Sequence, residues 1–82
     1  MANIKKNWSA ETQEQTHELL ASGMVFPGMD GRIHFKNIDG RFADASLSDV
    51  LSAPINIRDS ETGEEFSFAS VKSLLSGGWV LD

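Results

Sequence analysis

The chain has 82 residues, no cysteine, and a net charge of −5 from 12 acidic and 7 basic side chains. This length allows one hydrophobic core, and the absence of cysteine excludes disulfide bonds and thiolate metal sites. A phosphate-binding surface needs clustered lysine and arginine, so the charge argues against direct binding of nucleic acid. We therefore expect a single α+β domain over residues 1–82, with residues 1–7 as a flexible arm.

The first segment, MANIKKNWSAETQ, contains two lysines but no apolar run. It is therefore expected to be neither a secretory signal peptide nor a membrane anchor. The lack of cysteine is typical of proteins in a reducing compartment. Together these features predict a cytoplasmic protein that has no membrane partner.

The first predicted element is a helix that follows Ser9, has the sequence AETQEQTHELLAS and ends at Gly23. Serine can accept hydrogen bonds from the free amides of a first helical turn, and glycine is favoured where a helix ends in a left-handed conformation. Apolar residues occur only near the end of this helix, at Leu19 and Leu20. Its front half is therefore expected to be solvated or to face a partner.

Three short strands are predicted next. Met24–Phe26 is expected to form the first, and the segments RIHFK and RFADA then form a hairpin across Asp39 and Gly40. A two-residue loop would place Phe35 and Phe42 on the same face of the hairpin, whereas a three-residue loop would separate them. We expect the two-residue loop because it keeps the aromatic side chains together.

The rest of the chain predicts a helix, a hairpin, a helix and a strand. SLSDVLSAP is a short helix capped by Ser46, INIRD and EEFSFA form a hairpin around SETG, SVKSLLSGG is a short helix capped by Ser70, and WVLD is a strand. With a two- or four-residue loop, one face of the second hairpin carries Ile55, Ile57, Phe66 and Phe68.

The predicted element order is α-β-β-β-α-β-β-α-β. Such short helices need a sheet to pack on, so we expect an α+β fold. Its sheet would be mostly antiparallel or mixed and contain five to six short strands. One longer N-terminal helix and two short helices complete the prediction.

No motif predicts catalysis, a cofactor or a metal. The two histidines, His17 and His34, lack the spacing of a metal-binding pair, and no serine lies in a G-x-S-x-G motif. The acidic segment DSETGEE has glycine at its fifth position, whereas a calcium-binding loop requires it at the sixth. We therefore expect no enzyme activity and no bound cofactor or metal.

Acidic side chains and two apolar ones are candidate contacts with a partner. Helical spacing places Glu11, Glu14 and Glu18 on one face of the first helix. Trp8 either covers the core or is exposed as a binding residue, and Met29 lies in the turn-rich loop PGMDG. The complete predicted partner-binding set is Trp8, Glu11, Glu14, Glu18, Met29, Asp59, Glu61, Glu64 and Glu65.

These features favour a non-catalytic protein-binding module. It would be a small acidic regulator or inhibitor, for instance one encoded by a mobile element, that docks on a larger protein with a basic surface. One alternative is an acidic nucleic-acid mimic that blocks a basic groove. Another is a small structural subunit of a larger, phage-type assembly, in which WVLD is an open edge strand. The chain itself would be a monomer or a weak homo-oligomer formed through that edge.

Overall fold

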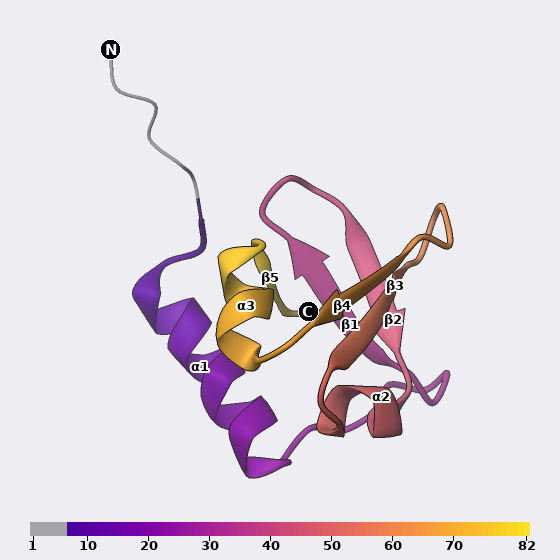
Figure 1. Cartoon of the computed structure of the whole chain (residues 1–82), viewed down its shortest axis with the longest axis horizontal. Coiled ribbons are helices and arrows are strands. Elements are labelled where there is room, and N and C mark those ends of the chain that lie inside the picture. Colours follow the sequence, from indigo (N-terminus) through magenta and orange to yellow (C-terminus); the bar gives the residue numbers. More distant parts are fainter. Residues whose placement is uncertain (1–6) are drawn as a thin grey trace.

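The computed structural model describes residues 7–82, which form three α-helices and five β-strands (Figure 1). In chain order these are α1 (Ala10–Ser22), β1 (Ile33–Asn37), β2 (Phe42–Ala45), α2 (Leu47–Leu51), β3 (Ile55–Asp59), β4 (Glu65–Phe68), α3 (Val71–Ser76) and β5 (Trp79–Leu81). The predicted α+β class is confirmed. Of the predicted flexible arm over residues 1–7, all but Asn7 lies outside the described residues.

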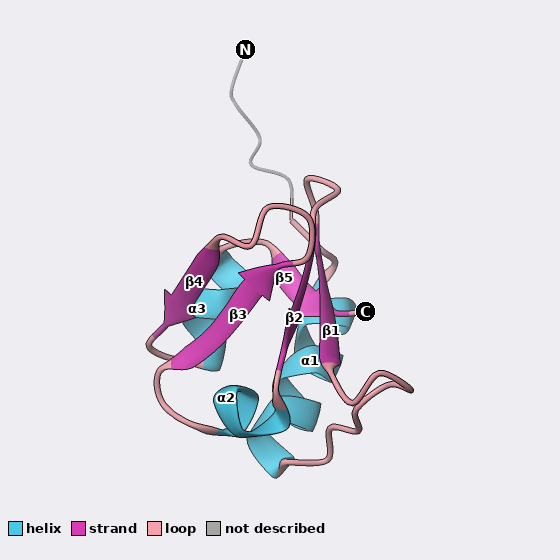
Figure 2. Cartoon of the chain, turned by 90° about the vertical axis from the view of Figure 1, so that its right-hand side faces the viewer, coloured by secondary structure: helices cyan, strands magenta, loops and turns pink. Residues whose placement is uncertain are grey.

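The five strands form one sheet in the order β4-β3-β2-β1-β5, and every neighbouring pair is antiparallel. Strands β1 to β4 therefore form a meander, and β5 returns to pair with β1. Helices α1 and α3 pack on each other and on β5, behind the sheet in the view of Figure 2. Helix α2 connects β2 to β3 and packs against β3.

The core lies between α1, α3 and the inner face of the sheet. The sheet curls so strongly that its two edge strands approach each other, with the ring centroids of Phe66 on β4 and Trp79 on β5 only 5.8 Å apart. Burial of apolar surface is the main driving force for such a fold. The largest fully buried side chains are Trp79, Phe35, Ile33, Ile57, Leu74 and Val80.

The predicted ends of the helices are confirmed. The hydroxyl oxygens of Ser9, Ser46 and Ser70 each accept a hydrogen bond from the backbone N–H three residues further on. These bonds satisfy amides that have no partner inside the helix. Gly23 ends α1 with a φ of 73°, in the left-handed region where glycine is favoured.

The prediction of a strand at Met24–Phe26 is wrong. Val25 is buried in the core, while its neighbours are exposed and the segment belongs to no sheet. The N–H of Met24 donates to the carbonyl oxygen of Leu19 at 3.1 Å, so the segment begins as an extension of the helix end. A strand also needs a neighbour, and β5 and β2 occupy the two sides of β1.

The predicted two-residue loop between β1 and β2 is also wrong, because three residues, 38–40, form it. The N–H of Asn37 donates to the carbonyl oxygen of Arg41 at 2.8 Å, and Phe35 lies opposite Ala43. Phe42 is therefore on the other face from Phe35 and is 56% exposed. Gly40 has a φ of 99°, and a three-residue loop needs a positive φ at this last position alone.

The face predicted for the second hairpin is confirmed. Ile57 lies opposite Phe66 and Ile55 opposite Phe68, and residues 60–63 form a four-residue loop. The two isoleucines are buried and the two phenylalanines are half-buried against the core. This hairpin therefore forms one wall of the core at the edge of the sheet.

Candidate functional site

The acidic face of α1 forms as the helical spacing predicts. Glu11, Glu14 and Glu18 are exposed and line one shallow hollow together with Gln15. Like charges spaced three or four residues apart repel each other and weaken a helix. This face therefore costs stability, and the helix is held by packing of its opposite side.

An apolar surface, which we call the α1-end patch, adjoins this acidic face. It consists of Leu19, Met24 and Phe26, which are 42%, 59% and 79% exposed. Glu18, Leu19 and Met24 line one shallow hollow. The three patch residues line a second hollow that extends to Asp82. Glu18 therefore joins the acidic face of α1 to a continuous apolar surface.

The α1-end patch was not predicted from the sequence. Leu19 and Leu20 are adjacent in the chain, and successive residues of an α-helix point about 100° apart, so only one of them can face the core directly. Thr16 and Leu20, four residues apart, face the core and are buried, which turns Leu19 outward. The four-residue spacing of Thr16 and Leu20 was the available signal for the buried face of the helix. It was easy to miss because this face includes a polar residue, Thr16.

The two predicted apolar contacts, Trp8 and Met29, lie in different environments. Trp8 packs against the core, and its Nε1 donates to the carbonyl oxygen of Gly78 at 2.8 Å. The Lys36 Nζ lies 5.1 Å from the centre of the Trp8 ring. Trp8 therefore covers the core, whereas Met29 is fully exposed in the loop between α1 and β1.

The acidic hairpin tip contains one residue with a structural role. Asp59 is buried, and its Oδ1 accepts hydrogen bonds from the backbone N–H groups of Glu61 and Thr62 at 2.8 and 2.9 Å. These amides hold the pKa of Asp59 below the usual aspartate value. Glu61, Glu64 and Glu65 are exposed and remain candidate contacts. Asp59 instead stabilises the turn that presents them.

The structure does not bring the two predicted acidic surfaces together. Helix α1 and the tip of the β3–β4 hairpin lie on opposite sides of the molecule (Figures 1 and 2). Between the two hairpin tips there is a separate hollow, where the exposed Phe42 lies beside Glu61. A single partner surface would therefore have to wrap the domain in order to contact both acidic regions.

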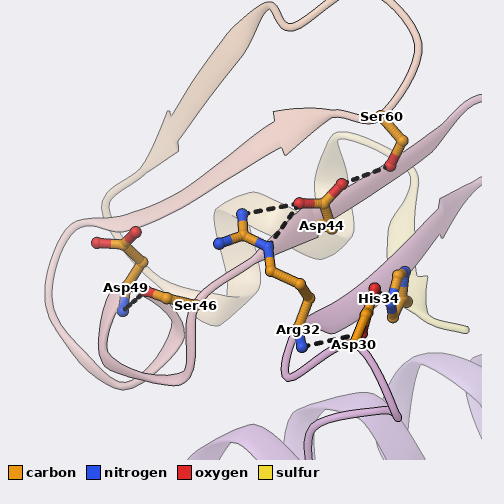
Figure 3. Close-up of polar contacts among 7 residues, drawn as sticks. All are labelled: Asp30, Arg32, His34, Asp44, Ser46, Asp49 and Ser60. Carbon is orange, nitrogen blue, oxygen red and sulfur yellow. Dashed lines mark hydrogen bonds and ion pairs between the residues drawn. The ribbon is translucent and has the colours of Figure 1, made fainter.

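A polar cluster lies on the outer face of the sheet (Figure 3). The Arg32 Nε and Nη2 donate to the Asp44 Oδ1 at 2.9 and 2.7 Å, and the Ser60 hydroxyl donates to the Asp44 Oδ2 at 2.7 Å. Burial alone would raise the pKa of Asp44, but the hydrogen bonds from Ser60 and Arg32 and the positive charge of Arg32 outweigh it. The pKa of this carboxyl group therefore lies below its usual value.

The remaining members of this cluster also stabilise local structure. Asp30 accepts the backbone N–H of Arg32 at 3.0 Å, and its Oδ2 lies 2.8 Å from the His34 Nε2 (Figure 3). The backbone N–H of Arg32 is the largest cause that lowers the pKa of Asp30. A carboxylate that acts as a general base near neutral pH instead has a raised pKa. The geometry thus fits a role in fixing the loop before β1.

Among residues 7–82, no three histidine, aspartate or glutamate side chains are grouped so that they could hold a metal ion. In the same part of the chain, no helix combines the length and the apolar character needed to cross a membrane. Searches against protein-family models, curated proteins and solved structures gave no match. Function must therefore be inferred from the exposed surfaces.

Proposed function

We propose that the chain is a non-catalytic cytoplasmic binding module that docks on a larger protein through the acidic face of α1 and the α1-end patch. The observation that carries this proposal is the exposure of Leu19, Met24 and Phe26 as neighbours. A small domain normally buries such side chains, and grouped exposed apolar residues are typical of interaction sites. Glu18 places negative charge directly beside them.

This surface defines the chemistry of the partner. Phe26 and Met24 require an apolar depression, because burial of large apolar side chains supplies most of the energy of such contacts. Glu11, Glu14 and Glu18 require lysine or arginine at the rim of that depression. Opposite charges at a rim mainly orient the partners and speed their association. The partner is therefore a protein with an apolar pocket next to a basic surface.

Two observations favour this function over its alternatives. A nucleic-acid mimic needs a continuous row of negative charge, but α1 and the acidic hairpin tip lie on opposite sides of the molecule (Figure 1). A subunit that assembles through β5 needs a free edge there. The Leu81 N–H, which points away from β1, instead donates to the Thr16 Oγ1 at 3.1 Å.

Affinity capture from the native host tests this function. The bait proteins are the unchanged chain, a variant that combines Met24→Ser with Phe26→Ser, and a control, Leu51→Ser. Leu51 on α2 is also exposed but lies outside the patch. We expect a partner that the unchanged chain and the Leu51 variant both recover and the patch variant does not. Equal recovery by all three baits would contradict the proposal.

Binding to the purified partner then tests the role of charge. Exchange of Glu11, Glu14 and Glu18 for lysine should raise the Kd by about tenfold or more, which corresponds to about 1.4 kcal/mol. Added salt should weaken binding of the unchanged chain but not of the lysine variant. A Kd unaffected by this reversal would show that α1 is not part of the interface. Competition by DNA would instead favour the nucleic-acid mimic.

A further inference from the structure

The outer side of β4 is a free sheet edge within the described part of the chain. The N–H of Asp59 donates to the carbonyl oxygen of Glu64 at 2.8 Å, so this pair is hydrogen-bonded across the hairpin. Hydrogen-bonded pairs alternate along an antiparallel ladder, which directs the backbone groups of Phe66 and Phe68 toward β3. The backbone groups of Glu65 and Ser67 therefore point away from the sheet.

No acceptor among residues 7–82 pairs with the backbone N–H of Glu65 or Ser67, and both residues are exposed. The opposite edge differs, because α1 packs on β5 and the Leu81 N–H is bonded to Thr16. An open edge at WVLD was one of the alternatives that the sequence left open. The described structure instead leaves it at β4, where Figure 2 shows the strand at the margin of the sheet.

We propose that β4 binds an extended segment of a partner protein as a sixth strand. The side chains of that strand would alternate between the two faces of the sheet. On the inner face they would lie beside Phe66, which is half-buried and apolar. On the outer face they would lie beside Glu65, with Glu61 and Glu64 close by in the chain. The segment would therefore alternate apolar residues with lysine or arginine.

Charge also disfavours a second copy of this chain as the occupant. In a symmetric pair the same strand would face itself, so each copy would bring its own Glu64 and Glu65 to the shared edge. Arg58, opposite Glu65 on β3, is the one basic residue in the β3–β4 hairpin, and from the other hairpin the Arg41 guanidinium lies 5.4 Å from the centre of the Phe66 ring. A basic segment removes this repulsion. Binding at β4 is independent of the surface proposed on α1 and the loop after it, which shares no residue with β4.

Amide hydrogen exchange on the full chain, followed by NMR, tests this site. The probe is the capped peptide Val-Lys-Val-Lys-Val-Lys, and the control probe is Val-Glu-Val-Glu-Val-Glu. We expect the lysine peptide to slow exchange at the N–H groups of Glu65 and Ser67 by about tenfold or more. The glutamate peptide should leave both rates unchanged. The variant Glu65→Lys should weaken the effect of the lysine peptide.

A matched pair of variants at Ser67 separates strand addition from general attraction to acidic groups. Ser67→Pro removes a backbone N–H that points outward, which an edge strand tolerates, and Ser67→Ala keeps it. The lysine peptide should protect Glu65 in the alanine variant but not in the proline variant. Four outcomes would overturn the proposal: no protection by the lysine peptide, equal protection by both peptides, protection already present in the free monomer, or a dimer that forms through β4.

Discussion

The two hairpins of the sheet are similar in sequence plan but differ in their surroundings. The β1–β2 hairpin lies inside the sheet, with β5 on one side and β3 on the other. The β3–β4 hairpin lies at the margin, where only β3 has a second neighbour. Phe35 in the first hairpin is fully buried, whereas Phe66 in the second is half-buried. The inner hairpin is thus built for stability, and the outer one leaves backbone groups and acidic side chains available.

The residue before each turn shows the same difference. Asn37 is buried, its Nδ2 donates to the Gly77 carbonyl oxygen at 2.9 Å, and its Oδ1 accepts the N–H of Asp39 at 3.0 Å. It therefore ties the first turn to the end of α3. The side chain of Asp59, at the corresponding place in the second hairpin, accepts hydrogen bonds from amides of its own turn. The first turn is tied to α3, 40 residues away, whereas the second is tied to the neighbouring strand β2, where the Ser60 N–H donates to the Phe42 carbonyl oxygen at 2.9 Å.

The largest expected effect is the loss of stability when an aromatic side chain is removed, and it should differ between the two hairpins. Phe35→Ala should lower the free energy of unfolding by about 3–5 kcal/mol, because it leaves a cavity in the centre of the sheet. Phe66→Ala should cost about 1–3 kcal/mol, since part of this side chain already contacts water. Urea unfolding followed by circular dichroism measures both values. Equal losses would show that the margin of the sheet is as well packed as its centre.

The next effect concerns the link between the first turn and α3. Asn37→Ala should cost about 1–3 kcal/mol, because it leaves the Gly77 carbonyl and the Asp39 N–H without their partner. Asn56→Ala in β3 is the comparison variant and should cost less, about 0.5–1 kcal/mol, because Asn56 is half-buried and its hydrogen-bond partners, Ser67 and Pro54, belong to exposed residues that water can reach. The same urea titration reports both. A loss at Asn37 no larger than at Asn56 would mean that water replaces these bonds.

Asn37 also explains which hairpin could be predicted from the sequence. In the second hairpin, turn residues and alternating apolar residues lead to the same register, so Ile55, Ile57, Phe66 and Phe68 were placed correctly. In the first, grouping the aromatic residues predicted a two-residue loop. The structure instead buries Ala43 beside Phe35 and exposes Phe42. The bond that holds this turn in place joins Asn37 to Gly77, 40 residues away, and no local pattern reveals it.

A smaller effect is expected at the glycines of the two turns. Gly40 and Gly63 have φ values of 99° and 79°, and a Cβ added at either would meet no atom within 4 Å. Gly40→Ala and Gly63→Ala should therefore each cost only the backbone strain, about 1–2 kcal/mol. Thermal unfolding should show similar losses in the two hairpins. A much smaller loss for Gly63→Ala would indicate that the outer turn relaxes into another conformation.

The smallest effect is a dependence on pH. Hydrogen bonds from backbone N–H groups lower the pKa of Asp39 and the pKa of Asp59. The donor to Asp39 is Arg41, and the donors to Asp59 are Thr62 and Glu61. The unfolded chain therefore takes up these protons first as the pH falls. Their contribution to stability is present above the usual aspartate pKa of about 4 and is lost as the pH falls through the lower folded values.

Urea unfolding between neutral and acidic pH measures this dependence. The variant Asp59→Asn should flatten the loss of stability at acidic pH more than Asp39→Asn. Two backbone amides donate to Asp59, whereas one donates to Asp39. If the two variants retain the full acid dependence, other carboxylates such as Asp44 account for it.

The candidate site was less predictable than the fold. Helical spacing correctly placed Glu11, Glu14 and Glu18 on one face, because that periodicity is a property of the backbone. The exposure of Met24 and Phe26 depends on which strand fills the space beside β1, and the structure gives that place to β5. The edge at β4 is free for the same reason, because β5 pairs with β1 and not with β4. Both outcomes depend on the pairing of β5, a distant segment, with β1.

The hydrogen bond between Thr16 and Leu81 makes α1 part of the cooperative unit of the whole domain. It joins residues 65 positions apart, and the bond from Trp8 to Gly78 spans 70 positions. The helix cannot detach without breaking its hydrogen bond to β5 and uncovering the core. A partner bound to α1 would therefore oppose global unfolding, by an amount that grows with the logarithm of its free concentration relative to its Kd. The melting temperature of the entire protein would thus report occupancy of a surface that contains only one helix and the loop after it.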